Sequence, residues 1–424
     1  MIRLVGTGVS VFLLVSLASA QTLDTTRRAR NDAREGPGNY YPLVCILPEG
    51  IRVEVLKSEG AWKEIRLGDP TVLQGLNLKD KESNLWMSKN CFAEKKGSSP
   101  LEGISVPWQS LQSSPSGVAA AIRGFALRYS KGAEKSPQTL EALDKQFFSP
   151  QEYHQFRLDS ERLREGQVRI AQGGEDAPCS RPYDLTLLEE AVGLGVAAQI
   201  AERGLVDDRR RLGYINLVAT YLSEQSGAFD APFRVFVLQG REPYAMSVPG
   251  GFIFFSQGII ELCRDEAELA GLLAHEMMHV ILGHGLKEIE KRPVQIRSDL
   301  AMAELESRTG KEPDPAKQDL ERFAQEAYET IRKPRLQAYE VEADRCALIL
   351  LAKAGYDPEA LPSMISRVKD FLAEEGASRL SNPFLSMDFQ NRYEEANRVI
   401  HSSLHNAKGV RNQDRYTANS KGTW

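Results

Sequence analysis

Two features are missing from this sequence: an excess of basic residues and a second long apolar run. Lysine and arginine number 53 against 58 aspartate and glutamate, which gives a formal net charge of −5. A protein that binds nucleic acid usually carries a basic patch or stripe, and this balance indicates none. After the first twenty residues, no uninterrupted apolar run approaches the length that spans a membrane. We therefore expect neither a nucleic-acid partner nor a transmembrane segment in the mature chain.

The first twenty residues have the pattern of a secretory signal peptide. Arg3 supplies a positive start, residues 9–17 form a short apolar stretch, and Ala18-Ser19-Ala20 is a small-residue cleavage site. This apolar stretch is too short to span a membrane. Cleavage of residues 1–20, after Ala20, predicts a periplasmic or secreted protein.

Cysteine is sparse and odd in number, with five residues in the chain. In an oxidising compartment an odd count leaves at least one thiol free or paired with another chain. Cys45 and Cys91 bracket a short β-rich segment whose ends meet if it closes into a small barrel, so we predict a disulfide between them. Cys263 and Cys346 lie in helical, largely apolar surroundings and are expected to be buried thiols.

Histidine is also scarce, with six residues, yet three of them fall between positions 275 and 284. In His275-Glu276-Met-Met-His279 the two imidazoles are four residues apart, on one face of a helix. Asp265 and Glu268 predict a capping box at the start of that helix, and an apolar stripe without proline follows. Such a motif arises by chance about 0.007 times in a chain of this composition. We therefore expect a metal shared by the two imidazoles, with Glu276 placed to take a proton from water.

A catalytic zinc needs three protein ligands and one open position. The metzincin spacing fails, because Leu282 and Gly285 stand where that motif requires glycine and histidine. His284 would lie about 180° round a continuous helix from His275, so it is not assigned as a ligand.

A carboxylate from a second helix remains as the third ligand. Glu340 and Asp344 share a helix face, so Glu340 can bind the metal while Asp344 accepts a hydrogen bond from a ligand imidazole. Glu342 points about 200° away from Glu340 and is the weaker candidate.

The segment before residue 95 is β-rich. Residues 21–38 are polar and charged, and we expect a mobile terminus there. Residues 40–94 contain short alternating runs, with Trp62 and Trp86 as aromatic plugs. This segment resembles a bacterial SH3-like domain, and the resemblance implies a cell-wall or protein ligand.

The rest of the chain reads as helices with two short strands. A Ser/Gly/Pro-rich linker at 95–116 precedes a helix at 118–129, and a second linker covers 172–178. Further helices are expected from residue 150, over 185–203, from 207, after Pro334 and from Asp388, with strands at 233–238 and 252–255 and a charged insertion at 286–333. We expect 252–255 to be an edge strand facing the substrate, because strand addition holds an extended peptide well.

Three motifs in this order are similar to those of a known peptidase family. They are Pro249-Gly250-Gly251, then His275-Glu276-Met-Met-His279 with Leu282-Gly283-His284, then Glu340-x-x-Ala343-Asp344. Over residues 183–400 the chain resembles the gluzincin family of the CAAX prenyl endopeptidase, HtpX and Oma-type proteases. The resemblance implies zinc on His275, His279 and Glu340, Glu276 as general base, and Asp344 as the aspartate sometimes assigned as proton donor. Soluble periplasmic members of the family are associated with envelope protein quality control.

One departure from the family pattern concerns the open zinc position. Many members carry Thr-His-Pro ahead of a late arginine, whereas here Ser386 stands six residues before Arg392. We expect water rather than a side chain of residues 380–392 at the fourth zinc position. Arg392 would be available to steady a developing oxyanion, as a charged donor aimed at the site can.

We expect an α+β protein with a mostly helical zincin domain, a small edge β-sheet and a preceding all-β SH3-like barrel. The expected divisions are a signal peptide at 1–20, an SH3-like domain at 40–94, a connecting region at 95–178, a metallopeptidase domain at 179–405 and a C-terminal tail at 406–424. The function indicated is an exported zinc endopeptidase acting on protein or peptide substrates. Two alternatives stay open: a catalytically weak zinc-binding chaperone or scaffold for unfolded chains, and a cell-wall-associated hydrolase.

Overall fold

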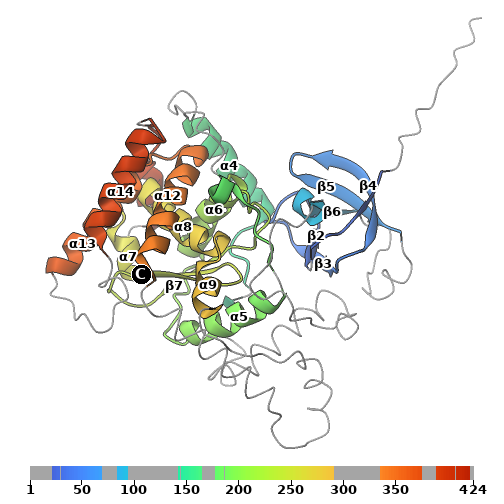
Figure 1. Ribbon diagram of the computed structural model, residues 1–424, viewed down its shortest axis with the longest axis horizontal. Coiled ribbons are helices and arrows are strands. Elements are labelled where there is room, and N and C mark those ends of the chain that lie inside the picture. The colour runs from blue at the N-terminus through green and yellow to red at the C-terminus, as the bar shows by residue number, and fades with distance from the viewer. Residues whose placement is uncertain are drawn as a thin grey trace, which may run out of the picture.

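The computed structural model describes residues 22–28, 30–68, 84–93, 142–143, 145–164, 177–185, 187–290, 335–374, 388–405 and 407–420. Several expected segments lie outside these residues: the signal peptide at 1–20, the linker at 95–116, the helix at 118–129, the insertion from 291 to 333, and Ser386. The described residues form a small β-domain and a larger, mainly helical domain beside it (Figure 1). The expected α+β class is confirmed.

The β-domain is a six-stranded antiparallel sheet. Its elements are β1 (Thr22–Thr25), β2 (Asn31–Arg34), β3 (Leu43–Leu47), β4 (Arg52–Glu59), β5 (Trp62–Leu67), β6 (Leu85–Ser88) and the 3₁₀ helix η1 (Lys89–Phe92), and the strand order is β1-β4-β5-β6-β2-β3. The expected mobile terminus at 21–38 is wrong, because β1 pairs with β4 and β2 lies between β6 and β3. These polar residues join the sheet through their backbones, which hydropathy alone does not reveal. The kinship with SH3-like domains stays a prediction.

The cysteines pair differently from expectation. Cys45 and Cys91 are buried free thiols, so the predicted disulfide between them is wrong; burial raises the pKa of Cys45 to about 12. Cys346 is bonded to Cys179 across 167 residues of sequence, with their Cα atoms 5.0 Å apart. It is therefore not the free thiol that we expected, whereas Cys263 is one. The sequence carries no signal for a pairing over this separation, because the chain fold alone brings the two residues together.

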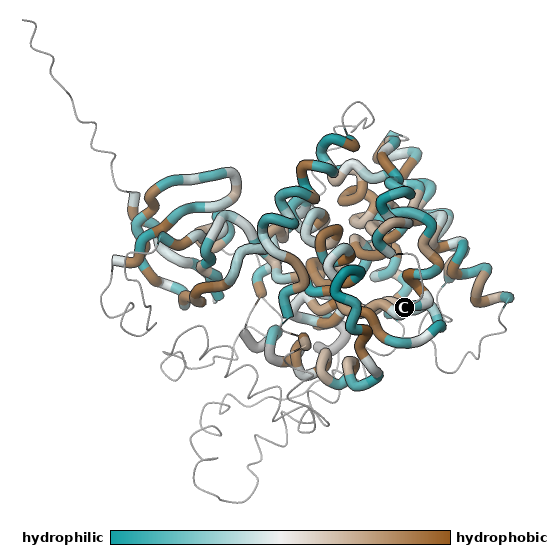
Figure 2. The backbone as a smooth tube through the Cα atoms, turned by 180° about the vertical axis from the view of Figure 1, so that it is seen from behind, coloured by the Kyte–Doolittle hydropathy of each residue, from teal (hydrophilic) through white to brown (hydrophobic). Residues whose placement is uncertain are grey.

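The larger domain is built around one central helix, α8 (Glu266–Ile281), which packs against helices before and after it in the chain and against a strand. The elements of this domain are α4 (Pro150–Arg164), η4 (Ala177–Ser180), α5 (Leu187–Ala201), α6 (Arg209–Glu224), β7 (Arg234–Leu238), β8 (Ala245–Val248), β9 (Phe252–Ser256), α7 (Gln257–Leu262), α8, α9 (His284–Glu290), α12 (Gln337–Ala354), α13 (Ala360–Glu374), α14 (Phe389–Ser402) and α15 (Gln413–Ser420). The main neighbours of α8 are α12, α13, α6 and β8, and α9 and α15 make smaller contacts with it. The hydrophobic stretches gather inside this domain and the hydrophilic ones on its outer turns (Figure 2). Side chains on α8 are thereby held away from water.

Local sequence signals set the ends of these helices. The Asp265 side chain accepts a hydrogen bond from Glu268 N at 2.9 Å, which confirms the predicted N-cap of α8. Asp388 caps α14 in the same way, accepting from Asn391 N at 2.9 Å. Gly355, with φ at +81°, ends α12 in the left-handed conformation that favours glycine.

The small sheet has the order β7-β9-β8, with β7 parallel and β8 antiparallel to β9. Residues 252–255 lie on β9, the central strand, and are fully buried, so the expectation of a substrate-facing edge strand there is wrong. The edge strand beside α8 is β8 instead, a short segment of mixed polarity that the sequence pattern did not show. Gly250 and Gly251 connect the two strands with φ near +87° and +86°, which explains why the turn uses glycine.

The C-terminal residues and the contact between the two domains also contribute to the fold. Helix α15 lies within the expected tail at 406–424, yet its Tyr416 is 1% exposed and belongs to the main core. The β-domain is held to the helical domain by Asp230, which accepts from Arg28 Nη1 at 2.7 Å and from Asn90 Nδ2 at 3.1 Å. Among helices of the described residues, none combines the length and apolar character needed to cross a membrane.

Candidate metal centre

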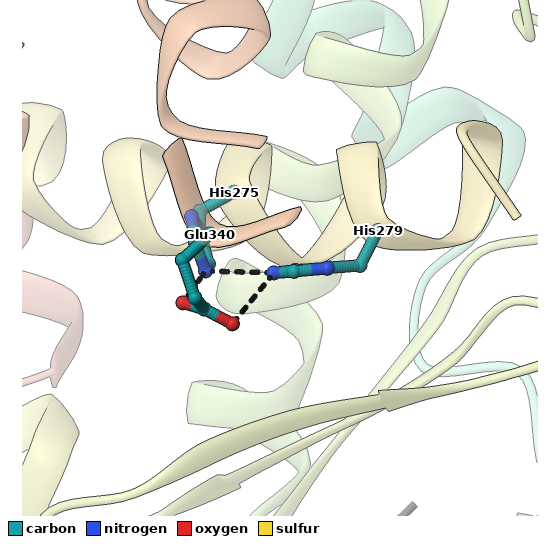
Figure 3. Close-up of side chains that lie close together, drawn as sticks. All are labelled: His275, His279 and Glu340. Atoms are coloured by element: carbon teal, nitrogen blue, oxygen red, sulfur yellow. Dashed lines mark hydrogen bonds and ion pairs between the residues drawn. The ribbon is translucent and has the colours of Figure 1, made fainter. Parts of the chain in front are cut away.

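Three side chains from two packed helices converge inside the helical domain. His275 and His279 project from α8 and Glu340 projects from α12, and all three point toward one another (Figure 3). The His275 Nε2 atom lies 3.1 Å from His279 Nε2, and Glu340 places one oxygen 3.3 Å from each of these nitrogens. Each side chain is at most 6% exposed. The three residues that the sequence singled out as ligands therefore lie together.

The spacing of these atoms fits a tetrahedral metal ion. Ligand bonds of about 2.0–2.1 Å at tetrahedral angles separate neighbouring ligand atoms by about 3.3–3.4 Å. The two Nε2 atoms are 3.1 Å apart, and each lies 3.3 Å from a Glu340 oxygen, Oε2 for His275 and Oε1 for His279, so these separations are close to this value. Glu340 is buried, and the polar groups that reach its oxygens are the two imidazoles and Arg392, whose Nη1 lies 3.0 Å from Oε2. An ionised carboxylate beside two neutral imidazole nitrogens is the combination of groups that binds a divalent cation. The donor set thus fits a metal ion.

Asp344 and Arg392 contact the ligand side chains and fix their positions. His275 Nδ1 lies 2.8 Å from Asp344 Oδ1, so the ring directs Nε2 toward the other two ligands. Arg392 donates to both oxygens of Asp344, from Nε at 2.7 Å and from Nη2 at 2.8 Å, and its Nη1 lies 3.0 Å from Glu340 Oε2. Burial alone would raise the pKa of Glu340, but Arg392 and His279 outweigh it and keep that pKa well below its usual range. The carboxylate is therefore ionised, as a metal ligand must be.

Arg392 is therefore not placed as the free oxyanion donor that we expected. It is 4% exposed, and its guanidinium is engaged by two carboxylates behind the ligands. The sequence pointed to Arg392 only because it stands six residues after Ser386, where many family members carry a histidine. That spacing does not show which side chains Arg392 contacts.

His284, which sequence reasoning set aside, supports the second ligand. Helix α8 ends at Ile281, and Gly283 with φ at +69° turns the chain, so His284 does not continue the helix. Its Nδ1 lies 2.9 Å from His279 Nδ1 and its Nε2 lies 3.3 Å from Glu342 Oε2. When His279 presents Nε2 to a metal, its Nδ1–H donates to His284 Nδ1, and His284 Nε2–H donates to Glu342. Burial, with Lys287 and Arg335, lowers the pKa of His284 to about 3, which keeps the ring neutral for this role.

Glu276, the expected general base, lies on α8 next to the first ligand and is 2% exposed. Its Oε2 is 3.4 Å from Nη1 of Arg335, a residue that the sequence did not single out. The same guanidinium donates to the backbone oxygen of Ser247 on β8. The only hint in the sequence is a basic residue just before the helix of Glu340.

Comparison with known proteins agrees with this arrangement. Residues 210–402 match the family described as Peptidase family M48, a span that runs from α6 to the end of α14 and includes every residue of the cluster. This part of the chain is a peptidase family M48 domain. Its family implies a metal ion, for which the His275, His279 and Glu340 group provides the ligands that the structure brings together.

Several curated proteins resemble the M48 domain. The mitochondrial metalloendopeptidase OMA1 of Schizosaccharomyces pombe is 29% identical over 156 residues, which is 37% of this chain and 43% of that protein. The putative beta-barrel assembly-enhancing protease of Vibrio cholerae is 29% identical over 37% of this chain and 32% of its own length. The beta-barrel assembly-enhancing protease of Escherichia coli is 23% identical over 39% of this chain and 34% of its own. The matched part spans less than half the length of each of these relatives.

Proposed function

We propose that this chain is a zinc endopeptidase that hydrolyses peptide bonds of protein substrates. The observation that carries the proposal is the close approach of His275, His279 and Glu340 on packed helices, with Glu276 beside them. The M48 domain and the protease names of the relatives support it.

The ligand set favours zinc among common metals. Two imidazoles and one carboxylate form a donor set that zinc uses in hydrolytic sites. When bound, zinc supplies Lewis-acid chemistry, polarising a carbonyl group and making water more acidic. The hydrogen-bonded partners of the ligands would hold each ring in the tautomer that leaves Nε2 free.

Glu276 would carry the proton transfers. Its carboxylate accepts a proton from the attacking water and later gives it to the nitrogen of the leaving amine. Because Glu276 is buried beside the ligand cluster, few other water molecules compete for that proton.

Asp344 and Arg392 are proposed as positioning residues. Asp344 orients the imidazole of His275, and Arg392 binds Asp344 and Glu340 at the same time. A proton-donor role for Asp344 is less consistent with this geometry. Burial would raise its pKa, but Arg392 and His275 hold the pKa below its usual range, so the carboxylate keeps no proton to donate.

We further propose that the protease is exported and acts in envelope protein quality control. The signal-like pattern of residues 1–20 supports export, and the beta-barrel assembly-enhancing proteases among the relatives support the quality-control role. A disulfide between Cys179 and Cys346 is typical of an oxidising compartment. The β-domain would bind a cell-wall or protein ligand.

Proteolysis by matched variants tests the proposal. The zinc-loaded wild-type protein should digest casein, and a chelator should abolish the digestion. Glu276→Gln should retain one metal ion per chain and lose activity, whereas Glu340→Ala should lose the metal on dialysis.

A cell-wall hydrolase would instead digest peptidoglycan and spare casein. A zinc-binding chaperone would suppress aggregation of unfolded chains equally well in wild type and Glu276→Gln, without cleavage. Either pattern would reject the endopeptidase, and normal zinc content in Glu340→Ala would reject the ligand assignment.

A further inference from the structure

Arg335 connects the proposed general base with the edge strand β8. Its Nη2 donates to Ser247 O at 2.9 Å and to Ser247 Oγ at 3.1 Å, and its Nη1 lies 3.4 Å from Glu276 Oε2. The Arg335 side chain is 10% exposed. One largely buried guanidinium therefore contacts both the proposed general base and the strand at the border of the site.

The charge of Arg335 is less neutralised than that of Arg392. Arg392 makes two short bonds to Asp344 and a further contact to Glu340. Arg335 bonds to two neutral oxygens of Ser247, and its separation from Glu276 exceeds the 2.7–2.9 Å that is typical of a charge-assisted bond. Arg335 is thus placed to stabilise a new negative charge.

The position of Arg335 coincides with the path of an extended substrate. Strand β8 pairs with β9 and, within the described residues, has no strand on its other side; it also packs against α8, the helix that carries the two histidines. A peptide that adds to this edge presents backbone N–H groups to acceptors such as Ser247 O. Substrate can therefore replace Arg335 as the donor to Ser247 and release Nη2.

Little space separates these groups at present. The cavity lined by Ser247, His279, Gly283 and Arg335 measures about 10 Å³, which is room for one water molecule at most. A carbonyl group that enters this region would lie within hydrogen-bonding reach of the guanidinium.

We propose that Arg335 is a catalytic residue, the donor that binds the oxygen of the scissile carbonyl as it becomes negatively charged. The inference rests on the proposed endopeptidase function. Water oxygen bonds to the carbonyl carbon, its proton passes to Glu276, and the π electrons move to the carbonyl oxygen. Arg335 donates hydrogen bonds to this oxyanion and keeps its own protons. When the C–N bond breaks, the electrons return to re-form the carbonyl, and Glu276 protonates the leaving nitrogen.

Two substitutions of Arg335 test this role. Arg335→Met keeps the apolar length of the side chain without its charge, and Arg335→Lys keeps a charge without the forked donors. Arg398→Met is the matched control, because Arg398 is exposed on α14 and pairs with Glu395 away from the site. The substrate is a casein peptide that wild type cleaves, and the probe is its phosphinic analogue, which mimics the tetrahedral oxyanion.

Arg335→Met should lower kcat about 10²- to 10³-fold, as loss of an oxyanion donor does, with KM and zinc content near wild type. Its affinity for the phosphinic analogue should fall by a similar factor, because the donor acts in the transition state. Arg335→Lys should recover part of both losses, and Arg398→Met should match wild type.

Other outcomes would overturn the role. Equal or faster cleavage by Arg335→Met would show that Arg335 only blocks the site until substrate displaces it. Loss of zinc from this variant would show that Arg335 instead holds the metal ligands in place. A fall in kcat without a fall in phosphinate affinity would limit it to positioning Glu276. Failure of zinc-loaded wild type to cleave any peptide would reject the endopeptidase proposal itself, and Arg335 as its catalytic residue with it.

Discussion

Replacing Asp344 separates the two roles suggested for it, proton donor and holder of His275. The Asp344 carboxylate contacts His275 Nδ1 at 2.8 Å and accepts two bonds from Arg392, and it is 1% exposed. Asp344→Asn keeps an oxygen that can accept from His275 but removes the negative charge. Asp344→Ala removes both.

Both effects weaken metal binding. Loss of a partner that orients a ligand typically costs 10- to 100-fold in metal affinity, about 1.4–2.8 kcal/mol. The positive charge of Arg392, no longer balanced by Asp344, also repels a cation at the ligand cluster. We expect Asp344→Asn to lie near the lower limit of this range and Asp344→Ala near the upper one.

The assay is a zinc titration against a competing chromophoric chelator, with urea unfolding measured in parallel. Removing one partner of a buried ion pair costs about 3–5 kcal/mol of folding stability, so affinity must be determined on folded protein. The double variant Asp344→Ala with Arg392→Met removes both charges, and it should recover part of the lost stability. Wild-type zinc affinity in Asp344→Asn together with lost activity would refute the positioning role and favour proton donation.

Three further predictions concern stability and the cysteines. Glu266 is fully buried and accepts hydrogen bonds from Tyr214, Tyr356, Asn412 and Arg415. Glu266→Ala should therefore lower the free energy of unfolding by about 3–5 kcal/mol. Glu242 is exposed, and Glu242→Ala should change the free energy little. Burial would raise the pKa of Asp32, but Arg30 and Arg34 outweigh it and hold the pKa in the folded protein below 3.8. Asp32 therefore stabilises the fold above pH 3.8, and this stabilisation is lost as the pH falls through the pKa of the folded state. Urea unfolding from pH 3 to 7 should show Asp32→Asn less stable than wild type at pH 7, with the gap closing in acid. In denaturant without reductant, thiol titration should find three free cysteines, and peptide mapping should find Cys179 joined to Cys346; a linked Cys45–Cys91 pair would contradict the structure.

The sequence by itself determined the elements and residues whose signals are local. The caps Asp265 and Asp388 bond backbone N–H groups three residues on, so their effect does not depend on the rest of the fold. The pairing of His275 with His279 follows from helix geometry alone, because residues four apart share a face. The third ligand, Glu340, could be named because its motif repeats a pattern seen in a known family.

Only the tertiary structure decided which distant groups meet. Strand β8 became the edge beside the metal centre through its pairing with β9, and Arg335 bonds to it from 88 residues away. The sequence placed Arg392 at the site but did not identify its partners. A guanidinium that can stabilise an oxyanion can equally bind a carboxylate, and in the structure Arg392 binds Asp344. The bond between Cys179 and Cys346 has the same origin. Such contacts depend on how helices and strands pack, and no periodicity or cap along the chain records where a side chain from another element will lie.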